Sequence, residues 1–241
     1  MKAIKIKDLL CGNPYPGRGI MVGLCPCGAS ALAAYFIMGR SANSRNRIFV
    51  EKPDGLYTKA FDEALVQDPS LIIYRAMAKF SCPCGKTNVV ITNGDQTDTI
   101  MELAPKGSHF EGALATRQFE PDAPNWTPRI SSLLSFADGD FTYKMNILKS
   151  ADSAGTACNR FNFAYSPIAG EGHFLSTYET DGNPLPSFEG EPRKIIVPEE
   201  LDDFAEEIWQ SLDSDNKISL FVCKIDIKSL EMKTKVINKN C

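Results

Sequence analysis

Residues 31–50 read ALAAYFIMGRSANSRNRIFV, and in this stretch a short polar segment joins two apolar runs. The runs, residues 31–38 and 48–50, have the composition of buried strands. The segment between them, residues 39–47, holds three arginines, two serines and two asparagines. Many hydrogen-bond donors with fixed positive charge suit an oxyanion, although a solvated turn between strands has the same composition. The rest of the chain has to decide between these two interpretations.

The composition is that of an ordinary globular protein. The chain has 241 residues, 43% hydrophobic and 23% charged, and we expect one domain over residues 1–241. The net charge of -4 argues against a nucleic-acid binder that relies on attraction to phosphates. No apolar run approaches the ~20 residues that cross a bilayer, and the start MKAIKIKDLLCG has no uninterrupted signal-peptide core. We therefore expect a cytoplasmic protein that binds neither nucleic acid nor membrane.

Eight cysteines are more than a cytoplasmic protein requires. Four of them lie in two copies of one tetrapeptide, Cys25-Pro-Cys-Gly28 and Cys82-Pro-Cys-Gly85. The one-residue spacing is tighter than in most structural zinc sites, and proline with glycine is typical of turns. We interpret the copies as separate hairpin turns. The alternative is a structural metal site that would join four thiolates, those of Cys25, Cys27, Cys82 and Cys84.

Strands are predicted where short apolar or alternating runs lie between turn residues. They cover residues 15–24, 31–38, 47–51, 79–81, 88–92, 141–147, 159–166, 173–178 and 217–227. Residues 181–192, rich in glycine and proline, are expected to form a surface loop.

Two short helices are predicted in the middle of the chain. The first would have Thr97 or Asp98 as its N-cap. The second would run from Ser108, the N-cap of a capping box with Glu111, to about Gln118. Both carry apolar residues that would face a core.

The clearest helix opens at Pro198, because apolar residues then recur at helical spacing and acidic residues fill the first turns. Residues 1–13 read as a polar lead-in, and residues 68–70 break any long helix before the apolar residues 71–74. Strands, helices, strands, a helix and a strand then follow in order. This order favours an α+β protein in which helices cover an antiparallel sheet.

Recognisable catalytic motifs are missing. The only histidines, His109 and His173, stand in no such motif, and we expect both to be structural or on the surface. The sequence has no GxSxG elbow, P-loop, GxGxxG or HExxH. What remains is a set of polar loops at the ends of apolar segments.

Taken together, these loops resemble the archaeal-type IMP cyclohydrolase family, in its order and roughly its spacing, over about residues 15–180. The matching stretches are Tyr15-Pro-Gly-Arg18, Arg40-Ser41, Asn46-Arg47, Tyr74, Asn93-Gly94 with Thr97-Asp-Thr-Ile100, Glu120, Thr127-Pro-Arg-Ile130 and Ser176-Thr-Tyr-Glu179. The two cysteine tetrapeptides and the length of residues 181–193 depart from the family pattern.

The resemblance implies a four-layer αββα sandwich, the N-terminal-nucleophile (Ntn) hydrolase architecture without its terminal nucleophile. It also implies an enzyme that closes the ring of 5-formamidoimidazole-4-carboxamide ribonucleotide to give IMP and water. In this reaction a carboxamide nitrogen attacks a formyl carbon. Holding the two groups in contact, stabilising the developing charge and moving protons would all lower the barrier. The implied reaction requires no metal or organic cofactor.

The matching positions suggest roles in this chemistry. We assign Tyr74 and Glu120 to proton transfer and orientation, and Arg47 to the formyl oxygen or carboxamide. Substrate binding is assigned to the remaining matching side chains, with three arginines for the 5'-phosphate and Asn93 and Asp98 for ribose or base. These substrate-binding residues are Arg18, Arg40, Ser41, Asn93, Asp98, Thr127 and Arg129. In the alternative interpretation, Tyr74 is a core aromatic residue and Glu120 a solvated loop carboxylate.

Two rival functions stay open. One is a protein that binds a purine nucleotide without turning it over. The other is an Ntn amidohydrolase whose nucleophile, Cys11, is exposed by removal of the first ten residues. For the cyclohydrolase and for the nucleotide-binding protein, the expected partner is a small purine ribonucleotide. A homo-oligomer is compatible with the sequence.

Overall fold

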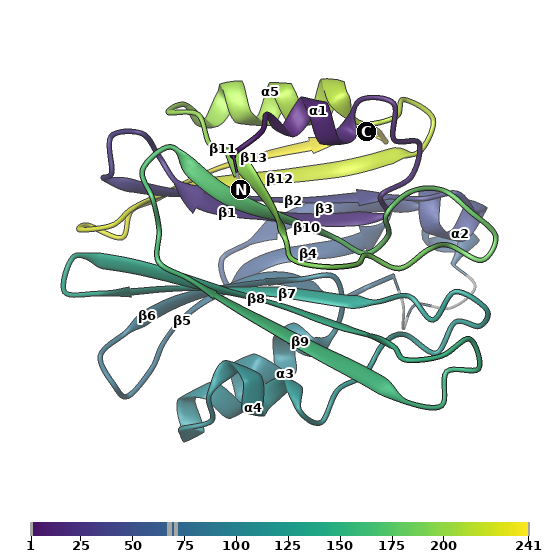
Figure 1. Ribbon diagram of the computed structural model, residues 1–241, viewed down its shortest axis with the longest axis horizontal. Coiled ribbons are helices and arrows are strands. Elements are labelled where there is room, and N and C mark those ends of the chain that lie inside the picture. Colours follow the sequence, from purple (N-terminus) through teal and green to yellow (C-terminus); the bar gives the residue numbers. More distant parts are fainter. Residues whose placement is uncertain (1, 67–68, 70–71, 241) are drawn as a thin grey trace.

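Two antiparallel sheets are stacked face to face, and helices cover the outer face of each sheet (Figure 1). The computed structural model describes residues 2–66, 69 and 72–240. The four layers follow the order α, β, β, α, with α1 and α5 on one side and α3 and α4 on the other. The α+β class and the αββα order that the resemblance implied are therefore confirmed.

The first sheet has six strands in the order β11-β10-β1-β2-β12-β13. Every neighbouring pair is antiparallel. The bounds are β1 (Arg18–Leu24), β2 (Ser30–Met38), β10 (Glu171–Ser176), β11 (Arg193–Ile196), β12 (Lys217–Asp226) and β13 (Met232–Asn238).

The second sheet has seven strands in sequence order, β3-β4-β5-β6-β7-β8-β9, so each strand pairs with the next along the chain. The bounds are β3 (Arg47–Lys52), β4 (Gly55–Ala60), β5 (Arg75–Ser81), β6 (Thr87–Thr92), β7 (Arg129–Ala137), β8 (Asp140–Ser150) and β9 (Cys158–Tyr165).

The helices are short apart from α5. Their bounds are α1 (Ile6–Leu10), α2 (Ala42–Arg45), α3 (Gln96–Leu103), α4 (Phe110–Leu114) and α5 (Leu201–Ser211), and Glu63–Leu65 and Ala104–Lys106 form 3-10 turns. No helix in the described part of the chain has the length and hydropathy to cross a membrane.

Strand β2 explains why the run at residues 31–38 is apolar throughout. Its odd-numbered side chains, among them Tyr35, pack into the core between the sheets. Its even-numbered side chains, among them Phe36, pack under α1 and α5. Because both faces of this strand are covered, all nine of its residues are buried. A third cluster, with Val90 and Phe110, lies between the second sheet and α3–α4.

The segment at residues 39–47 is more ordered than a loop. Ser41 caps the short helix α2, where its hydroxyl accepts a hydrogen bond from Ser44 N at 3.1 Å, and the reciprocal bond from Ser41 N to Ser44 Oγ is 3.0 Å. Arg47 then begins β3. The expectation of two strands joined by a polar segment is confirmed, with one helical turn inside the segment.

Several boundaries were predicted wrongly. Residues 1–13 are not only a polar lead-in, because they contain α1, which buries Ile6 and Leu10. The capping box at Ser108 does not form: α4 begins at Phe110 after His109 and ends at Leu114. The isolated capping signal is outweighed there by the packing of Phe110 against the sheet.

Two other helix starts also differ from prediction. The N-cap of α3 is Asp95, so Thr97 and Asp98 lie inside its first turn. The last helix starts at Leu201 after Glu200, three residues beyond Pro198. Strands β4, β7, β11 and β13 were not predicted. The break at residues 68–70 and the apolar residue at 71 fall outside the described residues, except for Pro69.

The loop at residues 181–192 is exposed over most of its length, as predicted, but Pro192 and two apolar side chains are buried. Leu185 is 7% exposed and Phe188 is 2% exposed. These two apolar anchors hold the loop against the body of the protein.

Candidate functional site

Half of the polar side chains singled out by sequence line a cavity of about 210 Å³ beside α2, named the arginine cavity below. It is lined by Tyr15, Arg18, Arg40, Ser41, Ser44, Arg47, Asp122, Asn125, Thr127, Tyr178 and Leu185. These residues come from segments that precede β1, follow β2, begin β3, precede β7 and follow β10. The fold therefore gathers distant parts of the chain at one place.

A buried cluster of polar side chains lies next to Arg18 and Arg47 of this lining, in the core between the sheets. Tyr35 on β2 and Tyr74, which precedes β5, place their hydroxyl oxygens 2.7 Å apart. Tyr74 is 5% exposed, and its backbone is fixed by Thr58: the Tyr74 N–H donates to Thr58 Oγ1 at 2.9 Å. The interpretation of Tyr74 as a core aromatic residue is thus correct for its ring, while its hydroxyl faces another phenol.

Arg18 and Glu120 form an ion pair beside this cluster, with Arg18 Nη1 3.5 Å from Glu120 Oε2. Glu120 is 3% exposed, so it is not a solvated loop carboxylate. Burial raises the pKa of Glu120, and the nearby cations of Arg18 and Arg129 only partly oppose this. The carboxyl group is therefore held closer to its neutral form than an exposed glutamate.

Arg47 is a buried cation with an unused donor. Its side chain donates from Nε to Ser44 O at 2.8 Å and from Nη2 to Met38 O at 3.1 Å. Nη1 is buried without a partner, and so is Nε of Arg18. Burial, followed by the adjacent charge of Arg18, lowers the pKa of Arg47. Two guanidinium groups face one carboxylate here, which leaves excess positive charge and free donors for an oxygen-rich ligand.

The outer rim carries the third arginine. Arg40 lies over the ring of Tyr15, with 5.0 Å between its central carbon and the ring centroid. Its guanidinium pairs with Asp181 and donates to Gly182 O at 3.0 Å. The loop at residues 181–192 thus closes the mouth of the arginine cavity from outside.

Two further predicted residues line the cavity with their hydroxyls already engaged. Thr127 Oγ1 hydrogen-bonds to Asp122 and to the Tyr178 hydroxyl. Ser41 caps α2, as described above. Ser41 and Thr127 therefore shape the wall of the cavity, while their hydroxyls hold neighbouring parts of the protein together.

Five predicted residues do not line the cavity: Tyr74 and Glu120, described above, and three others. Asn93 is fully buried, and its amide accepts from Ile130 N at 2.8 Å and donates to Pro128 O at 2.9 Å, so it fixes the start of β7. Arg129 Nη1 is engaged by Asp95 at 2.6 Å and by Gln96 at 2.8 Å. Asp98 is exposed and pairs with Arg75 at 3.4 Å.

Sequence reasoning missed seven side chains of this site: Tyr15, Tyr35, Ser44, Asp122, Asn125, Tyr178 and Leu185. Tyr15 and Tyr178 stand inside quoted family stretches, which was the available signal, and their rings stack at 6.0 Å. Tyr35 had a weaker signal, a single hydroxyl inside an otherwise apolar strand. Asp122 and Asn125 lie in a loop with no distinguishing pattern.

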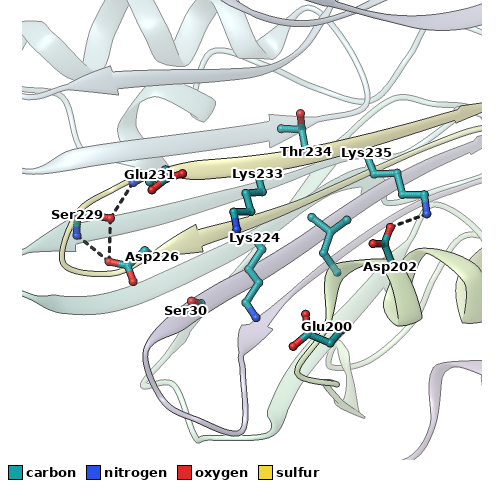
Figure 2. Close-up of a pocket in the computed structure, with 11 residues that line it drawn as sticks. Ser30, Glu200, Asp202, Lys224, Asp226, Ser229, Glu231, Lys233, Thr234 and Lys235 are labelled. Carbon is teal, nitrogen blue, oxygen red and sulfur yellow. Dashed lines mark hydrogen bonds and ion pairs between the residues drawn. The ribbon is translucent and has the colours of Figure 1, made fainter.

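A larger hollow of about 580 Å³ lies elsewhere, between the start of α5 and the β12–β13 hairpin (Figure 2). Some of its charges already have partners: Lys235 donates to Asp202 at 2.6 Å, and Asp226 accepts from Ser229 N at 2.7 Å. Lys224 donates to Glu199 O at 2.6 Å. None of the predicted site residues lines this hollow, so its size alone does not identify a site.

The four thiols of the tetrapeptides are not brought together. The turn at residues 25–28 joins β1 to β2 in the first sheet, and the turn at 82–85 joins β5 to β6 in the second. Within the described residues, no three His, Cys, Asp or Glu side chains are grouped closely enough to hold a metal. The interpretation as two separate hairpin turns is correct, and the four-thiolate site is not formed.

Comparison with known proteins gives one extended match. A family described as IMP cyclohydrolase-like protein matches residues 15–229. No curated protein matches the chain. Among solved structures, Anbu (ancestral beta-subunit) from Yersinia bercovieri is similar with a TM-score of 0.40 and 12% identity, over 93% of this chain and 88% of that one. A likeness this distant carries no argument here.

Proposed function

Because this chain belongs to the IMP cyclohydrolase-like family, which covers most of its length, we propose that it closes the purine ring of 5-formamidoimidazole-4-carboxamide ribonucleotide to give IMP and water. The observation that carries the proposal is the buried cluster of two phenols, a carboxyl group and two guanidinium groups with unused donors. The proposal includes a role in purine biosynthesis in the cytoplasm, with no cofactor.

The first requirement of this reaction is a stabiliser for the formyl oxygen, which gains negative charge when the carboxamide nitrogen attacks. Arg47 Nη1 and Arg18 Nε are buried donors without partners and are therefore suited to this oxygen. Arg47 is held from two other sides by Ser44 O and Met38 O, so its position is fixed before the substrate binds. A donor that needs no reorganisation stabilises the transition state most effectively.

The second requirement is proton transfer, because the amide nitrogen loses a proton and the departing hydroxyl gains one. We assign these transfers to Tyr74 and Glu120. Burial keeps Tyr35 protonated by raising its pKa well above the ordinary value, so Tyr35 can donate to the Tyr74 oxygen. Glu120, with its raised pKa, exchanges a proton more readily than an exposed carboxylate would.

The third requirement is a site for the 5'-phosphate. Arg40 at the rim is the exposed arginine of the cavity, and its present anionic partner is Asp181. We propose that the phosphate takes the place of the Asp181 carboxylate on Arg40. The cavity of about 210 Å³ is smaller than the ~300–1,000 Å³ of typical ligand sites, and release of the Arg40–Asp181 contact would open its mouth.

The amidohydrolase alternative receives no support from the placement of Cys11. This residue follows α1, is exposed and does not line the arginine cavity. Removal of the first ten residues would also remove Ile6 and Leu10 from the core under α5. Processing at Cys11 would therefore remove buried apolar side chains from the core. It would also place the nucleophile outside the arginine cavity.

A ring-closure assay tests the proposed function. Purified protein is incubated with the formamido ribonucleotide, and IMP is followed by absorbance and chromatography, with the Tyr74→Phe protein as the matched control. We expect IMP to form with the wild-type protein at a rate well above that of the variant. Tight binding of the nucleotide without any IMP would contradict the enzyme proposal and favour a purine-nucleotide-binding protein.

A further inference from the structure

The two copies of the cysteine tetrapeptide form the same kind of turn. In each, the glycine N–H donates to the carbonyl of the first cysteine, Gly28 to Cys25 at 2.9 Å and Gly85 to Cys82 at 3.0 Å. Both glycines have positive φ, 72° and 80°. The two cysteines of each turn are two positions apart, so their Cα atoms lie within roughly 7 Å, close to the range that a disulfide spans. The backbone alone therefore does not distinguish the two copies.

In the turn at residues 25–28, both cysteines interact with one glutamate. Cys27 Sγ donates to Glu199 Oε1 at 3.1 Å, and Cys27 N donates to Glu199 Oε2 at 3.0 Å. Cys25 is fully buried, and its thiol points at Glu199 O, 3.9 Å away. Lys224 anchors the same carboxylate at 3.0 Å. Cys27 is exposed, but its thiol is engaged by a carboxylate, and its neighbour Cys25 is buried, so the two sulfurs of this turn are not both accessible to a reagent.

In the turn at residues 82–85, the thiols have no carboxylate partner within the described part of the chain. Cys84 is exposed and Cys82 is half-buried. The amide of Asn88 donates to Cys82 Sγ at 3.1 Å, and Asn88 Oδ1 accepts from Ser135 Oγ at 2.8 Å, so the Cys82 sulfur is held in place. Burial and the adjacent Cys84, which hydrogen-bonds to it, raise the pKa of Cys82. These two thiols therefore interact with each other.

Both thiols also open onto a cavity of about 500 Å³ on the outer face of the second sheet, named the thiol cavity below. Its walls are largely apolar, with Phe80, Ile100, Phe110 and Leu133 among the lining residues. A cavity of this size and lining fits a small aromatic molecule. It lies under α3 and α4, on the opposite face of the sheet from the core that holds Tyr74.

We propose that Cys82 and Cys84 form a reactive dithiol that exchanges with small apolar disulfides bound in the thiol cavity. The Cys84 thiolate attacks one sulfur of the bound disulfide, breaks its S–S bond and releases the first thiolate. Cys82 then attacks the Cys84 sulfur, forms the Cys82–Cys84 bond and releases the second thiolate. The two protons of the cysteines pass to the two released thiolates. The dithiol is oxidised by two electrons, and the small disulfide is reduced by two.

This site is separate from the arginine cavity, so its test does not depend on the proposed function. The fully reduced protein is treated with 4,4'-dithiodipyridine, an apolar aromatic disulfide, and release of thiopyridone is followed by absorbance. Tryptic peptides covering residues 80–86 and 19–40 are then compared by mass. They carry the two tetrapeptides and provide an internal control with the same local sequence.

We expect residues 80–86 to lose two hydrogens at least tenfold faster than residues 19–40. Cys82→Ser should stop at a mixed disulfide on Cys84 with one thiopyridone released, whereas the Cys25→Ser/Cys27→Ser protein should react as the wild type does. The exposed Cys11 lies outside both tetrapeptides and serves as a reference thiol. Equal rates in the two peptides, or mixed disulfides at Cys84 that never close in the wild type, would overturn the proposal.

A second disulfide reagent tests whether binding in the thiol cavity contributes to the reaction. Cystamine is a dicationic disulfide that neither the apolar walls nor Lys86 and Lys144 of the lining should favour, and it should react with Cys84 far more slowly relative to Cys11 than 4,4'-dithiodipyridine does. The Phe110→Ala variant, which enlarges the cavity, should change this relative rate for the apolar reagent only. If both reagents gave the same Cys84-to-Cys11 ratio, binding in the cavity would be ruled out.

Discussion

The hydroxyl of Tyr35 lies 2.7 Å from the hydroxyl of Tyr74, and this contact links the two sheets inside their shared core. A buried phenol in an apolar core is costly unless its hydroxyl has a partner, and here each tyrosine supplies the other's. The pair lies next to Arg18 and Arg47, whose charges act on Tyr35. A packing role would need neither hydroxyl, so the pair indicates chemistry at this point of the core.

Replacement of Tyr74 by phenylalanine tests that indication most directly. The ring stays in the core, so the protein should fold, while the hydroxyl proposed for proton transfer is lost. We expect kcat for ring closure to fall by roughly 10²–10⁴-fold, the usual contribution of a positioned acid or base. Steady-state kinetics give the value, and circular dichroism verifies the fold.

Tyr35→Phe is the companion measurement, because Tyr35 positions the Tyr74 oxygen and is not assigned to proton transfer. The loss in kcat should be smaller than for Tyr74→Phe, and the pH dependence of kcat should shift because the partner of Tyr74 is gone. Full activity of both variants would remove the pair from the mechanism.

Arg40 and Arg45 provide a matched comparison within one nine-residue segment. Arg40 faces the arginine cavity, whereas Arg45 donates to Gly39 O and Asn216 outside it. Arg40→Ala should raise KM by about 10-fold or more, since a hydrogen bond to a charged group contributes roughly 1.5–3 kcal/mol, and kcat should change little. Arg45→Ala should leave both constants near the wild-type values.

Replacement of Asp181, the ion-pair partner of Arg40, should change KM in the opposite direction. Asp181→Asn removes the carboxylate that the phosphate is proposed to replace, so KM should fall. Kinetics at two salt concentrations separate this local effect from general screening. An unchanged KM in both Arg40→Ala and Asp181→Asn would place the phosphate elsewhere.

How much the sequence could predict depends on whether a signal is local. Strand β2 was predictable because it is covered on both faces, and a continuous apolar run is the direct consequence. Strand β13 was not predictable, because Lys233 and Lys235 on this edge strand make it resemble a loop, although such charges are common at sheet edges.

The site residues also divide into those with a local sequence signal and those without one. Arg40 and Arg47 were identifiable because polar residues are concentrated at residues 39–47. Tyr35 was not, because its meaning comes from Tyr74, which lies 39 positions away and in another sheet. Asn93 was assigned to the ligand but fixes β7, since an asparagine in a turn has the same local sequence in either role.

The first helix provides a stability prediction. Leu10 is 1% exposed and packs in the cluster under α5, whereas its neighbour Leu9 is only partly buried. Leu10→Ala should lower the free energy of unfolding by about 2–5 kcal/mol, through lost burial and the cavity left behind. Leu9→Ala should cost clearly less. Urea unfolding measures both, and equal costs would mean that α1 is not docked as described.

The second histidine predicts a pH dependence of stability. His173 Nδ1 lies 2.6 Å from the Tyr143 hydroxyl, and its ring stacks on Tyr165 at 3.6 Å. Burial first, and then the charge of Lys194 on β11, lower the pKa of His173 to about 4, while Glu171 opposes the shift. The folded protein therefore resists the proton that the unfolded chain binds near pH 6.5.

The sign follows from that difference in proton binding. Above about pH 6.5 the histidine is neutral in both states, and the contribution to stability is fully present. As the pH falls from about 6.5 to about 4, the unfolded chain binds a proton that the folded protein does not, so stability is lost over this window. Urea unfolding measured across this pH window should show a smaller decrease in the free energy of unfolding for His173→Gln, which cannot titrate, than for the wild type. The exposed His109, replaced in the same way, controls for the loss of a histidine elsewhere, and identical slopes for His173→Gln and the wild type would show that His173 is protonated equally in both states.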